Sequence, residues 1–315
     1  MNPISMKHLR YFDALARLGH FGRAAEDCAV TQPALSMQVK ELEELIGAPL
    51  VERTSRQTRL TGLGEAFAAR VQAILQAVDE LEDLARSSQA PFTGRLRIGA
   101  IPTVAPYLLP GLVADLTRDY PGLDLRLREA VTQKLVADLL EARLDAALVA
   151  LPVSEPLLVE TPLFDEDFIL LRPAAEAHLP VPDADDFSEL RLLLLEEGHC
   201  FREQALAFCK MSGVRTPRNI MEGNALATLV QMVGAGIGMT LVPEIALGLE
   251  TRSARVAMAR LADPPPSRTI GLVWRRSSPL AEDLRSIGDV ARRVALTAQA
   301  EALKLAPRGK LVGRG

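Results

Sequence analysis

Two cysteines nine residues apart are the side chains of this sequence best suited to chemistry. Cys200 and Cys209 lie in the segment LLLLEEGHCFREQALAFCK, whose pattern predicts a strand, a turn and a helix. Nine residues of helix separate two Cα atoms by roughly 13 Å, whereas a disulfide needs its Cα atoms within about 7 Å. A bond between these thiols would require the helix to unwind or move, and that coupling would act as a switch.

The composition indicates a soluble globular protein of two or three domains. Of the 315 residues, 48% are hydrophobic and 24% are charged. No run of 18 apolar residues and no signal peptide is present, so we expect a cytoplasmic protein with no membrane partner. The three cysteines fit no zinc pattern, and we expect neither a metal nor a cofactor. In a reducing compartment such thiols are either core packing or redox groups, and residue statistics alone favour packing.

The first sixty residues have the pattern of a helix-turn-helix. Apolar residues at helical spacing predict a first helix over 5–18, a second near 23–28, and a third from Thr31, as its cap, to Gly47. The short second connection and the small residues of the second helix allow close packing. We expect Cys28, on the second helix, to be a packing residue.

Polar and basic side chains of this segment are positioned to meet DNA. The third helix carries polar residues away from its apolar stripe, and PLVERTSRQTRLT predicts a basic wing. The net charge of −4 is uneven, with +1 over residues 1–60 and −5 over the rest. The alternative is a helical bundle with a solvated polar face. The candidate DNA contacts are Thr31, Gln32, Pro33, Ser36, Gln38, Lys40, Arg53 and Arg56.

A long helix and an α/β region follow. Thr61 can cap a helix to about Ser88 whose apolar residues, from Phe67 to Ala85, form a coiled-coil seam, unless the helix packs on its own domain. Strands and helices then alternate from RLRIGA onward, which predicts parallel α/β sheets. A second unit begins near Phe164, and IGLVWRR from Ile270 is expected to return to the first, leaving a ligand cleft between two lobes.

The run FGRAAEDCAVTQPALSMQVKELEELIGAPLVERTSRQTRLTGLGEAF resembles the DNA-binding signature of LysR-type transcriptional regulators. The resemblance implies an all-α winged helix-turn-helix domain, a long linker helix and a two-lobed α/β effector domain of the periplasmic-binding-protein type. It also implies a homodimer or homotetramer on dyad sites in promoter DNA. The expected divisions are 1–60 for the DNA-binding domain, 61–90 for the linker, 91–305 for the effector domain (lobe I 91–163 and 269–305, lobe II 164–268) and 306–315 for a disordered tail.

Further segments resemble the peroxide-sensing members of that family. They are IGAIPTVAPYLLP, EAVTQKL, LEEGHCFREQALAFC and RTIGLVWRRSSPL, and GHC followed by FC is the most specific. By this resemblance Cys200 is the peroxide-reacting cysteine and Cys209 the resolving one. The chemistry agrees, because thiols ionise more readily at a helix N-terminus or near cations such as Arg202, although Glu196 and Glu197 oppose this. A sulfenic acid at Cys200 would condense with Cys209 to a disulfide.

The resemblance also assigns a peroxide pocket to Thr103, Thr132 and His199. The alternative for each threonine is a helix cap. Arg268 could hold the sulfenate or disulfide segment, or could equally form a surface ion pair.

We therefore expect a DNA-binding activator of antioxidant genes, not an enzyme, that senses hydrogen peroxide. Its partners would be promoter DNA, RNA polymerase, further copies of the chain and a thiol reductant that resets the switch. One alternative is a LysR-type regulator controlled by a metabolite in the cleft, with the cysteines as packing. Another is a thiol peroxidase, which would have no use for a helix-turn-helix.

Overall fold

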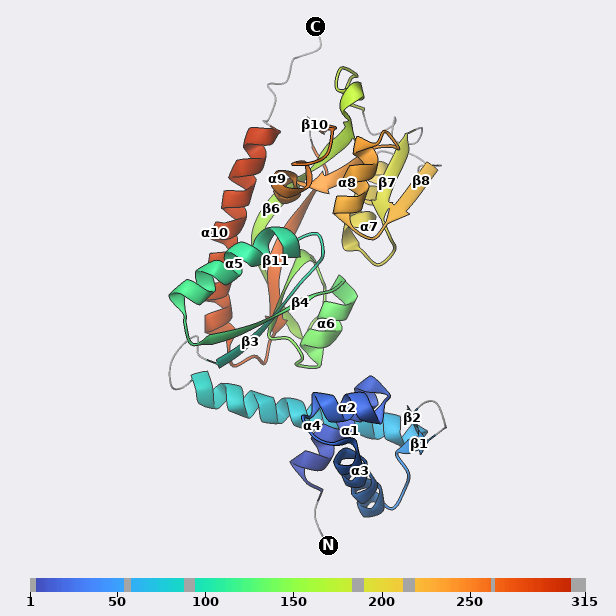
Figure 1. Cartoon of the computed structure of the whole chain (residues 1–315). Helices are drawn as coiled ribbons and strands as arrows, with labels where there is room; N and C mark the ends of the chain where they lie inside the picture. The colour runs from blue at the N-terminus through green and yellow to red at the C-terminus, as the bar shows by residue number, and fades with distance from the viewer. Residues whose placement is uncertain are drawn as a thin grey trace. The chain divides into compact units, whose positions relative to one another are not determined.

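The computed structural model describes residues 4–53, 58–87, 94–182, 190–211, 219–261 and 264–306. The chain forms two compact units, Met1–Ala85 and Arg86–Gly315 (Figure 1). Among the described residues, no helix is long and apolar enough to cross a membrane.

Three helices, a small strand pair and a longer fourth helix build the first unit. Its elements are α1 (Met6–Leu18), α2 (Phe21–Asp27), α3 (Gln32–Ile46), β1 (Val51–Arg53), β2 (Thr58–Leu60) and α4 (Gly62–Ser87). The Ser5 hydroxyl caps α1, and Gly19 and Gly47 end α1 and α3 in the left-handed region, as the sequence predicts. Thr31 precedes α3, but its side chain makes no capping hydrogen bond, so the predicted cap is wrong in its chemistry.

The strands β1 and β2 pair antiparallel, with Val51 opposite Leu60, at the position predicted for the wing. Residues 54–57, including the candidate contact Arg56, lie outside the described residues, as does the side chain of Arg53. Their expected DNA contacts stay predictions.

The apolar residues of helix α4 are buried in its first turns and exposed farther along. Thr61 caps it by accepting a hydrogen bond from the backbone N–H of Gly64 at 2.9 Å. Near its start, Val71 is buried and Phe67 packs against the core of the first unit. Farther along, Ile74 and Leu81 are 47% and 65% exposed. The first turns thus pack on their own unit, and the later apolar positions are open to a partner helix.

The second unit is an α/β fold that begins with β3 (Gly94–Ala100). It continues with α5 (Ala105–Asp119), β4 (Leu123–Glu129), α6 (Thr132–Leu140), β5 (Ala146–Leu151), β6 (Leu158–Pro173), β7 (Arg191–Leu195) and α7 (Cys200–Met211). It ends with β8 (Asn219–Gly223), α8 (Leu226–Gly234), β9 (Thr240–Pro243), α9 (Leu247–Glu250), β10 (Val256–Arg260), β11 (Ser267–Arg275) and α10 (Ala281–Leu305).

The main sheet has the order β10-β6-β11-β5-β3-β4, with β9 also paired to β6. The strands β3, β4 and β5 are parallel, and β11 returns to pair with β5, as predicted. The sheet as a whole is nevertheless mixed, because β11 runs antiparallel to both β5 and β6, and β9 and β10 run antiparallel to β6. The strand β11 enters the sheet between β5 and β6 and runs in the direction opposite to both, which makes the sheet mixed. Figure 1 shows α5 and α10 beside this sheet, with α6 on its other side.

Two separate hydrophobic cores lie within the second unit. The first surrounds β3, β5, α5 and the first part of α10, and the second surrounds β7, α8, β9 and the later part of β6. The strand β6 contributes Leu163 to the first core and Phe168 to the second, so it crosses without a break the boundary expected near Phe164. Ala306, expected in the tail, is buried, and its carbonyl accepts a hydrogen bond from Arg260. Residues 307–315 lie outside the described residues.

Candidate functional site

The turn between β7 and α7 places Cys200 at the first position of a helix. The strand β7 is anchored by its buried leucines and by parallel pairing with β8. Gly198 has a φ of +93°, a conformation that glycine adopts without a steric penalty. The chain can therefore reverse tightly and start α7 at Cys200, as the sequence predicts.

Cys200 and Phe201 contact different cores. Cys200 is half-buried and packs against the first core, whereas Phe201 is 1% exposed and belongs to the second. The Phe201 ring meets Phe168 edge to face, with centroids 4.8 Å apart. The cysteine therefore lies at the junction of the two cores, where a rearrangement of α7 would disturb both.

A small cavity brings three of the predicted pocket residues together with Cys200. Thr103 follows β3, Thr132 begins α6, and His199 and Cys200 begin α7, and all four line one cavity of about 10 Å³. That volume is about what one water molecule needs. The carboxyl ends of the parallel strands β3 and β4 lead into this cavity, which is where α/β sheets bind ligands.

Gly99 allows α6 to approach β3 closely enough to form the cavity. A Cβ at this position would lie 2.6 Å from Leu135 Cδ2 and 2.7 Å from Leu144 Cδ1. Any larger residue on β3 would push α6, and Thr132 with it, away from Thr103.

The Thr132 hydroxyl is buried and has no hydrogen-bond partner among the residues that the structure describes. It is the first residue of α6, after the cap position at Val131, so the alternative of a helix cap is wrong. Buried polar groups in proteins are normally paired. An unpaired hydroxyl on the wall of a water-sized cavity indicates a place for a small polar ligand.

Arg268 supports Thr103 from behind the cavity. Its guanidinium donates to Thr103 Oγ1 at 2.7 Å and to the Thr103 carbonyl oxygen at 3.0 Å. It also pairs with Glu166 at 2.7 Å, and both of these side chains are 0% exposed. The surface ion pair considered from the sequence is therefore wrong, because the pair is buried. Since the Thr103 oxygen accepts from Arg268, its own proton remains available to the cavity.

His199 is held in its neutral form. Burial lowers the pKa of His199 below 6.5, although the carboxylates of Glu196 and Glu129 oppose this shift. A neutral imidazole carries one N–H donor and one acceptor nitrogen. It can therefore donate one hydrogen bond and accept another at the cavity.

The cation expected beside Cys200 is already engaged. Arg202 donates to the Leu195 carbonyl oxygen at 2.9 Å and pairs with Glu222 at 2.8 Å. Its charge is therefore shared with a carboxylate, and its clearest role is to fasten α7 to β7 and β8.

The helix α7 runs without a break from Cys200 through Cys209 to Met211. The side chain of Cys209 lies outside the described residues. A continuous helix keeps the two Cα atoms roughly 13 Å apart, beyond the reach of about 7 Å for a disulfide. This backbone corresponds to a reduced state, and a bond between the cysteines requires part of α7 to unwind.

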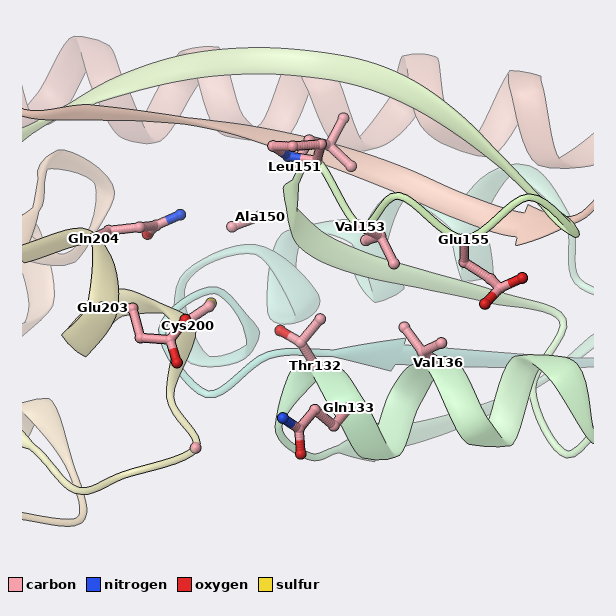
Figure 2. A pocket seen from close by; sticks show the side chains of 12 residues that line it. Thr132, Gln133, Val136, Ala150, Leu151, Val153, Glu155, Cys200, Glu203 and Gln204 are labelled. Carbon is pink, nitrogen blue, oxygen red and sulfur yellow. The ribbon is translucent and has the colours of Figure 1, made fainter. Parts of the chain in front are cut away.

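A second, larger cavity of about 520 Å³ also borders Cys200 (Figure 2). Its lining comes from α6, from the turn after β5 and from the start of α7. These residues are Thr132, Gln133, Val136, Ala150, Leu151, Pro152, Val153, Glu155, Gly198, Cys200, Glu203 and Gln204. Thr132 and Cys200 line both cavities, which the sequence alone could not show.

In the first unit, α3 presents an exposed polar surface. Thr31, Gln32, Pro33 and Lys40 are exposed and Ser36 is half-buried. Gln38 donates to Glu41 at 2.8 Å, and Lys40 pairs with Glu44 at 3.4 Å. Met37, which the sequence reasoning passed over, is 63% exposed one turn after Pro33. An apolar side chain at such a position can contact a thymine methyl group.

Cys28 lies at the end of α2, half-buried against the core of the first unit. Burial and the neighbouring Asp27 raise the pKa of the Cys28 thiol. Both features suit the packing role predicted for it.

Known proteins resemble the chain along nearly its whole length. It is 43% identical over 292 residues to a probable hydrogen peroxide-inducible genes activator of Streptomyces viridosporus, covering 91% of this chain and 93% of the relative. It is 39% identical over 293 residues to the DNA-binding transcriptional dual regulator OxyR of Escherichia coli K12, covering 92% and 95%.

Two solved structures are also similar. A full-length cysteine-to-aspartate variant of OxyR from Pseudomonas aeruginosa has a TM-score of 0.73 and 34% identity, covering 93% of this chain and 96% of that one. An H₂O₂-bound cysteine-to-serine mutant of Corynebacterium glutamicum OxyR has a TM-score of 0.67 and 32% identity, covering 98% of both chains.

The family models agree with these relatives. Residues 6–65 match the bacterial regulatory helix-turn-helix protein model of the lysR family, and residues 89–295 match the LysR substrate binding domain. The helix-turn-helix unit, the two-core α/β unit and these matches together show that the chain belongs to the LysR family of transcriptional regulators.

Proposed function

We propose that this protein is a DNA-binding transcriptional regulator that senses hydrogen peroxide by oxidation of Cys200. The observation that carries the proposal is the cavity of about 10 Å³ that is lined by Cys200, His199, Thr103 and Thr132, whose buried hydroxyl has no partner among the described residues. This set offers hydrogen-bonding groups on several sides of a ligand the size of a peroxide. The peroxide-related names of the relatives support the same signal.

In this proposal Cys209 resolves the sulfenic acid formed at Cys200. Peroxide gives an oxygen atom to the Cys200 sulfur, and the Cys209 thiol then displaces that oxygen as water. Because α7 is continuous in the reduced state, the disulfide selects a partly unwound helix. The altered junction between the two cores would carry the signal to the DNA-binding unit.

The proposed organisation follows the expected divisions at 1–60, 61–90 and 91–305, with the two hydrophobic cores supporting two lobes. The exposed Ile74 and Leu81 of α4 support a homodimer or homotetramer. We further propose a cytoplasmic location, contact with RNA polymerase at promoters and resetting by a cellular thiol reductant.

A brief pulse of near-stoichiometric hydrogen peroxide is expected to join Cys200 and Cys209. Alkylation of the remaining thiols followed by peptide mass spectrometry would identify the linked peptides, and Cys28 should stay alkylated. Backbone amides of α7 should exchange hydrogen faster after the pulse, because their helical hydrogen bonds are lost. Free thiols at both positions after the pulse would overturn the proposal.

Gln32→Ala is expected to weaken binding to a selected DNA site by about 1–3 kcal/mol, because the Gln32 amide can form hydrogen bonds with a base edge. The affinity for random-sequence DNA should change little. Lys40→Ala should weaken binding to both duplexes and lower the salt slope by about 1, as expected for a phosphate contact. Anisotropy titrations at several salt concentrations, using a duplex selected from a random pool, measure both effects. An equal loss on both duplexes for Gln32→Ala would contradict base recognition.

A second candidate function rests on the 520 Å³ cavity, whose volume suits a small metabolite. In that case the ligand, and not the thiols, would control the regulator. A metabolite-induced thermal shift that persists after Cys200→Ser and Cys209→Ser would favour this candidate.

A further inference from the structure

The small and the large cavity share two lining residues, and one of them is the cysteine proposed to react. Cys200 and Thr132 line both of them, so the thiol borders the larger space as well as the small one. Figure 2 shows Thr132 and Val136 on the side of α6 that faces this space, with Cys200 beyond Thr132. Val136 lies one helical turn after Thr132, at the spacing that places two side chains on one face.

The larger cavity offers an apolar wall next to a polar rim. The wall consists of Val136, Ala150, Leu151, Pro152 and Val153. Hydrogen peroxide has no group that would occupy such a wall, whereas apolar pockets of 300–1,000 Å³ commonly bind organic molecules. The wall is therefore unused by the proposed signal.

We propose that neutral alkyl hydroperoxides are a second class of oxidant for this protein. The proposal rests on the proposed function of Cys200. The O–O group occupies the small cavity, and the alkyl group passes Thr132 and lies on the apolar wall of the large one.

The chemistry is the same two-electron oxidation. The Cys200 sulfur attacks the distal oxygen of ROOH, an S–O bond forms as the O–O bond breaks, and the alkoxide leaves as the alcohol ROH after taking the thiol proton. The Cys209 thiol then forms the S–S bond, and water leaves. One hydroperoxide is reduced to alcohol and water while two thiols are oxidised to one disulfide.

The charge of the rim selects among hydroperoxides. Glu155 and Glu203 are the charged residues that line the large cavity among the described residues, and no Lys, Arg or His lines it there. The two carboxylates would repel a hydroperoxide that carries a carboxylate of its own, whereas a neutral hydroperoxide would not be repelled. The expected ligands are therefore neutral and compact, such as cumene hydroperoxide.

The test compares oxidation rates of the full-length protein with cumene hydroperoxide, its para-carboxy derivative and hydrogen peroxide. The readout is the Cys200–Cys209 disulfide after quenching with an alkylating reagent at timed intervals. We expect cumene hydroperoxide to form the same disulfide, and its carboxylated derivative to react more slowly. Glu155→Gln removes one negative charge and keeps an oxygen that can accept a hydrogen bond from the Leu157 N–H. This variant should reduce the difference between the oxidation rates with cumene hydroperoxide and with its carboxylated derivative.

Val136→Phe should fill the path along the apolar wall. We expect the rate with cumene hydroperoxide to fall about tenfold relative to the rate with hydrogen peroxide, equivalent to a barrier change of ~1.4 kcal/mol. Leu157→Phe is the matched control, because Leu157 is 65% exposed and does not line the cavity. If Val136→Phe fails to fold, Val153→Phe fills the same space from the opposite side.

The outcomes separate this proposal from the function on which it rests. Disulfide formation with hydrogen peroxide but not with cumene hydroperoxide overturns the second oxidant class alone. An equal fall of both rates in Val136→Phe and in Val153→Phe also overturns it. If neither oxidant joins the cysteines, the proposed function fails and this inference fails with it.

Discussion

Cys200→Ser is expected to abolish both the disulfide and the transcriptional response to peroxide, whereas Cys209→Ser should stop the reaction at a sulfenic acid on Cys200. The two variants differ because Cys200 is the thiol proposed to react with peroxide, and it lines the small cavity with Thr103, Thr132 and His199. A hydroxyl in place of the thiol is not oxidised by peroxide, so no later step can occur. A thiol retained at Cys200 with no resolving partner can still accept the oxygen atom.

Trapping with dimedone and intact-protein mass spectrometry distinguishes the two states. One added dimedone group is expected for oxidised Cys209→Ser and none for Cys200→Ser. Cys28→Ser is the matched control, since the Cys28 thiol lies in the first unit and burial raises its pKa. A normal reporter response from Cys200→Ser would refute the redox mechanism.

The contacts of the first turn of α7 indicate which part of the helix stays in place. Phe201 is buried against Phe168, its ring lies 5.5 Å from the Arg268 guanidinium carbon, and Arg202 is tied to Glu222. Removing a buried Phe from its core costs about 1.5–3 kcal/mol. The first turn of α7 is therefore anchored, and we expect the turns near Cys209 to unwind and bring that thiol to Cys200.

The sequence predicted the elements of the fold well because their signals are local. Apolar periodicity and glycine stops predict α1 and α3, Thr61 predicts the start of α4, and the segment before Cys200 predicts β7 and α7. Strand direction depends on which strands become neighbours, which local patterns do not contain. For that reason the antiparallel pairing of β11 with β5 and β6 was missed.

The candidate site was predictable in its residue types but not in its geometry. The resemblance to peroxide-sensing relatives named Thr103, Thr132 and His199, and these residues do meet at one cavity with Cys200. Nothing in the sequence indicated that Glu166 would form a buried ion pair with Arg268, because the two residues are 102 positions apart. The larger cavity likewise arises from segments whose proximity only the tertiary structure determines.

Arg268→Met is expected to lower the free energy of unfolding of the second unit by about 3–5 kcal/mol, because it leaves the buried carboxylate of Glu166 without its partner. The Glu166 carboxylate would keep only the backbone N–H of Ile245, which it accepts at 3.1 Å. Thr103 would also lose both donors from Arg268, so we expect slower oxidation of Cys200 as well.

Urea unfolding followed by tryptophan fluorescence measures the stability change in the intact chain. Trp274 is the single tryptophan of the sequence, and it is 1% exposed on β11, so its signal reports the second unit. Arg285→Met is the matched control, because it removes an exposed ion pair with Glu282 worth about 0–1 kcal/mol. The double variant Glu166→Gln with Arg268→Met should lose less than the sum of the single changes, since no charge is left unpaired.

The pH dependence of the Arg268→Met variant gives an independent check on the pair. Burial raises the pKa of Glu166 above 4.5, and Arg268 opposes that rise, so removing Arg268 should raise the pKa further. A carboxyl whose pKa is higher in the folded state binds more protons folded than unfolded, and stability then falls as the pH rises from about 4.5 toward the raised value. The deficit of the variant should therefore be larger at pH 7 than at pH 5. If Arg268→Met lowers the free energy of unfolding no more than Arg285→Met does at both pH values, the Arg268–Glu166 pair does not hold Thr103 and the junction of the two cores in place.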